Sequence, residues 1–107
     1  MKLPEQVKIG YKTYQIRPQD RDDTDTDYNF GFANHNINLI RSRDYGDKVD
    51  CANTLLHEIL HGCFHVGSLG LEHDEEERIV TVLTNQLIAA MQDSPDVFRW
   101  IMRNANG

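Results

Sequence analysis

The residues best suited to chemistry lie in one short stretch, His57-Glu58-Ile59-Leu60-His61. On a helix, side chains four residues apart project from one face, so His57 and His61 can bind one metal ion. Glu58 follows His57 about 100° further round the axis, where its carboxylate can reach a water on that metal without being a ligand. The spacing therefore predicts two zinc ligands, His57 and His61, and a general base, Glu58.

The helix predicted for residues 48–66, ending near Gly67, has two chemically different sides. At 100° per residue, the polar side gathers within about a quarter turn; it holds Thr54, His57, Glu58, His61 and His65. The other side is apolar and is expected to be buried; it holds Leu55, Leu56, Ile59, Leu60, Cys63 and Val66. The His-Glu-x-x-His pattern arises in roughly 1% of shuffled chains of this composition, which disfavours an accidental surface helix.

A third protein ligand is needed, because a catalytic zinc site has three protein ligands and a water. His65 lies one turn beyond His61, and three ligands in line on one helix would splay away from a tetrahedral centre. We therefore interpret His65 as a supporting or packing residue. The next helix, predicted for residues 73–92, begins with Glu75, Glu76 and Glu77, and its apolar stripe alone leaves the register among these carboxylates open.

The elements that must position these residues indicate an α+β fold. Residues 6–17 predict one or two strands with a turn at Gly10, and residues 30–32 and 37–40 predict a hairpin around Asn34-His35-Asn36. We expect a small antiparallel sheet of about three strands packed on the active-site helix and the glutamate-bearing helix. A short C-terminal helix opens at Ser94-Pro95 and is expected to pack on the core, with a partner surface as the alternative.

Composition excludes several function classes for this chain of 107 residues, which we expect to form a single domain over residues 1–107. A net charge of −6 disfavours binding to nucleic acid, and no window is apolar enough to predict a membrane span. Cys51 and Cys63, if both are on one helix, lie about 18 Å apart, too far for a disulfide. Together with the absence of a signal-like start, this predicts a cytoplasmic protein. The five aspartates in residues 18–27 indicate a solvated loop rather than a calcium site.

The stretch from Thr54 to His61, with the acidic helix start that follows, resembles small phage and prophage zinc metallopeptidases. These are similar to minigluzincins and to ImmA/IrrE-type peptidases, and the likeness covers roughly residues 28–92. Such proteins follow the ligand glutamate with an aliphatic or small residue at +3, a polar one at +4 and an apolar one at +6. Since Val80, Thr81 and Leu83 fit this pattern for Glu77, the resemblance implies Glu77 as the third ligand, with Glu76 as the alternative.

These observations predict a zinc-dependent metallopeptidase that holds one Zn²⁺ ion and hydrolyses peptide bonds with a metal-activated water and Glu58 as general base. The substrate is expected to be a protein or peptide that pairs with the edge of strand 37–40. If the chain is phage-encoded, it would act in the cytoplasm of the host cell. The sequence leaves the oligomeric state open. It also leaves the oxyanion-stabilising residue open among four candidates, Tyr28, His35, Tyr45 and His73.

The alternative is a non-catalytic phage accessory protein that uses the same zinc ligands structurally. His65 or His73 would then have to supply a fourth ligand that closes the site. A third interpretation is an interaction protein in which the motif is accidental.

Overall fold

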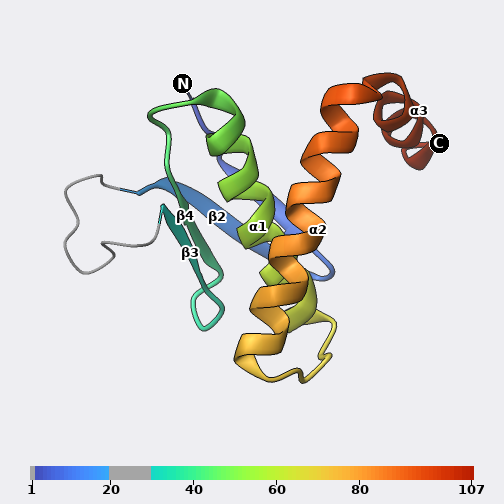
Figure 1. Ribbon diagram of the computed structural model, residues 1–107. Coiled ribbons are helices and arrows are strands. Elements are labelled where there is room, and N and C mark those ends of the chain that lie inside the picture. Colours follow the sequence, from blue (N-terminus) through green and yellow to red (C-terminus); the bar gives the residue numbers. More distant parts are fainter. Residues whose placement is uncertain (1, 20–29) are drawn as a thin grey trace.

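The chain was studied as a computed structural model that describes residues 2–19 and 30–107. Four strands and three helices form in this part of the chain. The strands are β1 (Gln6–Ile9), β2 (Lys12–Pro18), β3 (Gly31–Asn34) and β4 (Leu39–Ser42), and the helices are α1 (Lys48–Val66), α2 (His73–Asp93) and α3 (Pro95–Ala105). Figure 1 shows α1 lying across the sheet, α2 beside α1, and α3 at the far end of α2. The predicted acidic loop, from residue 20 on, and Tyr28 lie outside the described residues.

The sheet confirms the α+β class but corrects the expected strand number and pairing. It has four strands in the order β1-β2-β4-β3, and it is mixed rather than antiparallel. β2 and β4 run parallel, with Ile16 opposite Ile40, while both hairpins are antiparallel. Placing β4 beside β2 buries both isoleucines in one core, which explains why the second hairpin docks in this orientation.

The strand order also determines which strand lies at the edge of the sheet. The segment expected to offer an edge to substrate includes the first half of β4, but β4 is hydrogen-bonded on both sides, to β2 and to β3. The prediction of an edge at residues 37–40 is therefore wrong. Among the strands of the described residues, the outer one on this side is β3, whose second edge faces away from β4.

The core lies between the sheet and α1. Its buried residues all come from the sheet, and α1 packs Leu55, Ile59 and Val66 against them. A Cβ built on Gly62 would come within 2.6 Å of Ile9 Cδ1, so a glycine at this point lets the helix approach β1 closely. The aliphatic side of α1 thus faces the core as predicted, but its residues are only partly buried, and Cys63 is exposed.

Local capping fixes where α1 begins. The Asp47 carboxylate accepts hydrogen bonds from the backbone N–H groups of Val49 (2.8 Å) and Asp50 (3.2 Å). The bounds 48–66 agree with the prediction, and α2 begins at His73 as expected. Cys51 and Cys63 are both free thiols, also as expected. In the described ranges, no helix combines the length and the apolar character that a membrane span requires.

The C-terminal helix differs from the expectation that it packs on the core. α3 begins with Pro95 in its first turn, as predicted, but none of its residues is buried. Its main contact is with α2, and Figure 1 shows it projecting away from the sheet. Trp100 and Met102 each keep 59% of their surface exposed.

Candidate metal centre

Three side chains from two helices converge at the middle of α1. His57 Nε2 lies 2.9 Å from one carboxylate oxygen of Glu77, and His61 Nε2 lies 2.7 Å from the other. The two Nε2 atoms are 3.2 Å apart. In the described residues these side chains form the one group of three or more potential metal ligands, with their donor atoms all within 4.8 Å of one another.

The donor set and its spacing fit a tetrahedral zinc ion. Two nitrogens bound to such an ion at about 2.05 Å stand roughly 3.3 Å apart, close to the 3.2 Å between the two imidazoles. Two imidazoles and one carboxylate are a ligand set that catalytic zinc sites use, and that set leaves a fourth position open. The fit comes from helix geometry, because the i, i+4 spacing on α1 places both rings on the side that faces α2.

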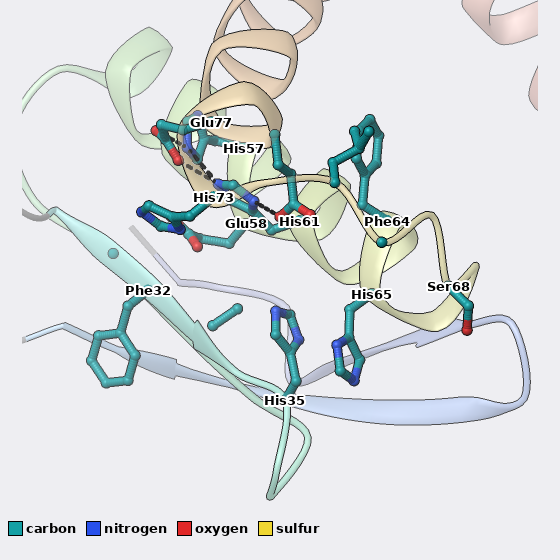
Figure 2. Close-up of a pocket in the computed structure, with 15 residues that line it drawn as sticks. Phe32, His35, His57, Glu58, His61, Phe64, His65, Ser68, His73 and Glu77 are labelled. Carbon is teal, nitrogen blue, oxygen red and sulfur yellow. Dashed lines mark hydrogen bonds and ion pairs between the residues drawn. The ribbon is translucent and has the colours of Figure 1, made fainter.

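The structure separates the two glutamates between which the sequence left the register open. Glu77 faces both Nε2 atoms, as stated above, whereas the Glu76 carboxylate lies 2.6 Å from the other ring nitrogen of His61, Nδ1. A carboxylate at Nδ1 holds the ring orientation and makes the opposite nitrogen a better ligand. Figure 2 shows this chain of contacts running from Glu77 through His61.

Electrostatics at the centre follow from burial and from these contacts. Burial lowers the pKa of His57, and the nearby Glu77 offsets this only in part. Burial also acts to lower the pKa of His61, but hydrogen bonds to Glu76 and Glu77 outweigh it and raise that pKa. Burial acts to raise the pKa of Glu77, yet the two histidines hold it below its usual range. The Glu77 carboxylate is therefore anionic near neutral pH, as a metal ligand must be.

Glu58 is the most buried charged residue of the site, with 8% of its surface exposed. Burial raises the pKa of its carboxyl from 4.5 to about 7, against the opposing effect of His61. A carboxyl with a pKa near neutrality can both accept and return a proton at that pH, which is the property required of a general base.

An open cavity of about 870 Å³ lies over these residues, between α1, β3 and the start of α2. His57, Glu58, His61 and Glu77 all line it, and so does β3 through Gly31, Phe32 and Ala33. The outer strand of the sheet thus runs beside the metal centre. Its closeness to α1 depends on Gly31, where a Cβ would lie 2.9 Å from Thr54 Cγ2.

The fold also brings together three aromatic rings, those of Tyr14, His35 and His65, which the sequence did not predict to be in contact. His35 and His65 line the cavity. The rings of His35 and His65 stack with centroids 4.3 Å apart and an interplanar angle of 7°. His35 Nδ1 is also 2.9 Å from the hydroxyl of Tyr14, a fully buried core residue. Burial, followed by the charges of His65 and His61, lowers the pKa of His35. No sequence spacing links residues 14, 35 and 65, so only the folded chain reveals this group.

The other described residues that the sequence singled out lie outside the group of three potential ligands. His65 stacks on His35 and is outside the group of potential metal ligands, in keeping with a packing role. His73 lines the cavity but is also outside that group. Of the described oxyanion candidates, His35 and His73 line the cavity, whereas Tyr45 is not among its lining residues.

Comparison with known proteins adds no assignment. No protein-family model matches the chain, and neither a curated protein nor a solved structure matches it.

Proposed function

We propose that this chain is a zinc-dependent metallopeptidase with His57, His61 and Glu77 as the metal ligands and Glu58 as the general base. The observation that carries the proposal is the convergence of the two Nε2 atoms and the Glu77 carboxylate within 4.8 Å, beside a buried carboxyl. The group lies in an open cavity rather than in a closed core, which favours a site that substrate can reach.

Each residue has a defined task in the proposed reaction. When bound, zinc would supply Lewis-acid activation of a water and of the scissile carbonyl. Glu58 accepts a proton from the attacking water and then donates it to the nitrogen of the leaving amine. Glu76 holds the ring of His61 through Nδ1. The outer edge of β3, the last strand of the sheet in the described residues, can pair with an extended peptide, which would bring its peptide bonds past Glu58.

The number of ligands favours a catalytic site over a structural zinc module. A structural site closes with four protein ligands, whereas the described part of the chain offers three in this group. His65 and His73, which would have to supply the fourth, are not part of it.

Substitution of Glu58 tests the proposal. We expect purified protein to hold one zinc ion per chain and to cleave unstructured protein substrates such as casein. Glu58→Gln should retain the zinc and lose activity by about 10²- to 10⁴-fold, since only proton transfer is removed. His57→Ala should lose the zinc itself. Zinc content by mass spectrometry and peptide release measure the two effects; full activity in Glu58→Gln would contradict the mechanism.

A further inference from the structure

Large apolar side chains remain exposed mainly on α2 and α3. Seven of the twelve such residues in the described part of the chain belong to α2 and α3; they are Val82, Leu83, Met91, Val97, Trp100, Ile101 and Met102. Scattered single exposures are ordinary, but a concentration of this kind marks an interaction surface. The surface is separate from the metal centre, so the inference does not depend on the proposed function.

Apart from its contact with α2, α3 is left uncovered by the rest of the described chain. None of its residues is buried, and a helix of 11 residues is only marginally stable in water without packing. Val97, Trp100 and Ile101 have the i, i+3, i+4 spacing that places side chains on one face. Their exposed fractions are 54%, 59% and 47%. This face requires a cover from outside the chain as described.

α2 presents a matching surface, which we call its outer flank and define by Ile79, Val82, Leu83, Ala89 and Ala90. Val82 lies about 200° round the helix from the buried residues Val80 and Thr84, so it points away from α1. The outer flank extends over about 16 Å, and the 11 residues of α3 extend over a similar length. The apolar face of α3, from Val97 to Ile101, covers about 6 Å of this length, so it fits within the outer flank.

These two surfaces cannot cover each other within one chain. A single residue, Ser94, connects α2 to α3, so α3 reaches only the end of its own α2. Val82 lies more than ten residues before that connection. When one chain carries both halves of a contact that it cannot close internally, a two-fold symmetric pair closes both at once.

Charge complementarity points to the same arrangement. The start of α2 is acidic, with Asp74 and Glu75 exposed, whereas α3 carries Arg99, which pairs with Asp96 at 2.6 Å, and Arg103 near its C-terminal end. An α3 helix that lies along the outer flank of a second copy with its C-terminal end toward Ile79 brings Arg103 toward that acidic start. An anionic bilayer is a poorer cover, because the chain carries a net charge of −6 and α3 has no lysine.

We propose that the chain forms a two-fold symmetric homodimer in which α3 of each copy covers the outer flank of α2 of the other copy. Each copy supplies one face of α2 and one face of α3 to the contact, both within residues 79–105. The cavity lies on the opposite side of α2, toward α1 and β3, and stays open in this dimer.

Trp100 is the only tryptophan of the chain and therefore reports on the contact directly. We expect light scattering to give twice the 12.4 kDa mass of one chain. The Trp100 emission should be blue-shifted at high concentration and should shift to the red on dilution, as the indole returns to water. Val82→Glu should produce a monomer and the same red shift, although Val82 is eighteen residues from the fluorophore.

Val49→Glu is the matched control, since Val49 is a similarly exposed valine (45%) on α1 outside the proposed contact. It should leave both mass and emission unchanged, and circular dichroism should show equal helix content in all three proteins. A monomeric wild type with solvent-exposed Trp100 emission overturns the proposal. A dimer that Val82→Glu does not weaken also overturns it, because the contact must then lie elsewhere. If Val82→Glu loses helix content, the wild-type dilution series decides alone.

Discussion

At the scale of the residue, Glu58 combines the position proposed for the general base with a cost in stability. Its carboxyl is almost fully buried, and burial raises its pKa from 4.5 to about 7. A carboxyl whose folded pKa lies above its unfolded value destabilises the fold once it ionises. This cost is absent below about pH 4.5, grows as the pH rises, and is complete above about pH 7.

Glu58→Gln should therefore stabilise the metal-free protein in alkaline solution. At roughly 1.4 kcal/mol per unit of pKa, the gain should reach about 3 kcal/mol near pH 8 and should be small near pH 5. Urea unfolding with a chelator present measures it. Glu72→Gln, at an exposed position, is the control and should show no such pH dependence. A gain that is equal at both pH values would argue against an elevated pKa for Glu58.

Glu76 and Glu77 are neighbours in sequence with different contacts, and their substitutions should differ accordingly. Glu76→Gln keeps the shape of the side chain but removes the charge at His61 Nδ1, so zinc affinity should fall by about 10- to 100-fold. Glu77→Gln should lower it further, because a proposed ligand is lost. Glu75→Gln, at an exposed position of the same turn, should leave affinity unchanged. Competition with a fluorescent zinc chelator measures all three; equal affinities for the Glu75 and Glu76 variants would contradict the assignment.

At the scale of the element, the site depends on the distance between β3 and α1. Gly31 allows the outer strand to pass close to the helix, since a Cβ there would lie 2.6 Å from the Arg41 carbonyl oxygen and 2.9 Å from Thr54 Cγ2. Backbone atoms cannot yield as the end of a flexible side chain can. The strand itself would have to move.

Gly31→Ala should consequently lower the free energy of unfolding by about 1–3 kcal/mol, although alanine suits a strand better than glycine does. Zinc affinity should change little, because all three proposed ligands are on α1 and α2. Peptide cleavage should fall, because β3 lines the cavity. Chemical unfolding, zinc titration and cleavage assays separate these effects. An unchanged free energy of unfolding would show that β3 can move away from α1 at no cost.

At the scale of the whole molecule, the core is small, so the proposed metal should contribute much to stability. Only six apolar residues of the described chain are buried. The position of α2 therefore depends mainly on the direct contacts between α2 and α1. The proposed ligands join these two helices. A ligand that binds only the folded state stabilises it by about 4 kcal/mol at 1,000 times its dissociation constant.

Removal of zinc should therefore lower the melting temperature by at least about 10 °C near neutral pH. The effect should shrink as the pH falls, since the pKa of His61 is raised and protons then compete with the metal for its ring. Melting curves with and without chelator, at several pH values, measure this. His57→Ala should have the same melting temperature with and without zinc. If the chelator leaves the melting temperature of the wild type unchanged, zinc does not stabilise the fold as proposed.

The sequence by itself determined the elements and the chemistry that local spacing encodes. Periodicity and capping predicted α1 at its observed bounds, and the four-residue spacing predicted that His57 and His61 share one face. These features depend on neighbours within one or two turns, so a linear pattern contains them. The resemblance favoured Glu77 over Glu76, and the fold places these two at different nitrogens of His61.

Only the tertiary structure decided what depends on long-range packing. The parallel pairing of β2 with β4 places β3, not β4, at the edge, because burying Ile16 beside Ile40 outweighs the simpler meander. The contacts that join Tyr14, His35 and His65 arise in the same way, from segments far apart in the chain. The apolar face of α3 is as evident in the sequence as that of α1. Which of the two would be buried within the chain depended on how the helices connect and pack, which no local pattern records.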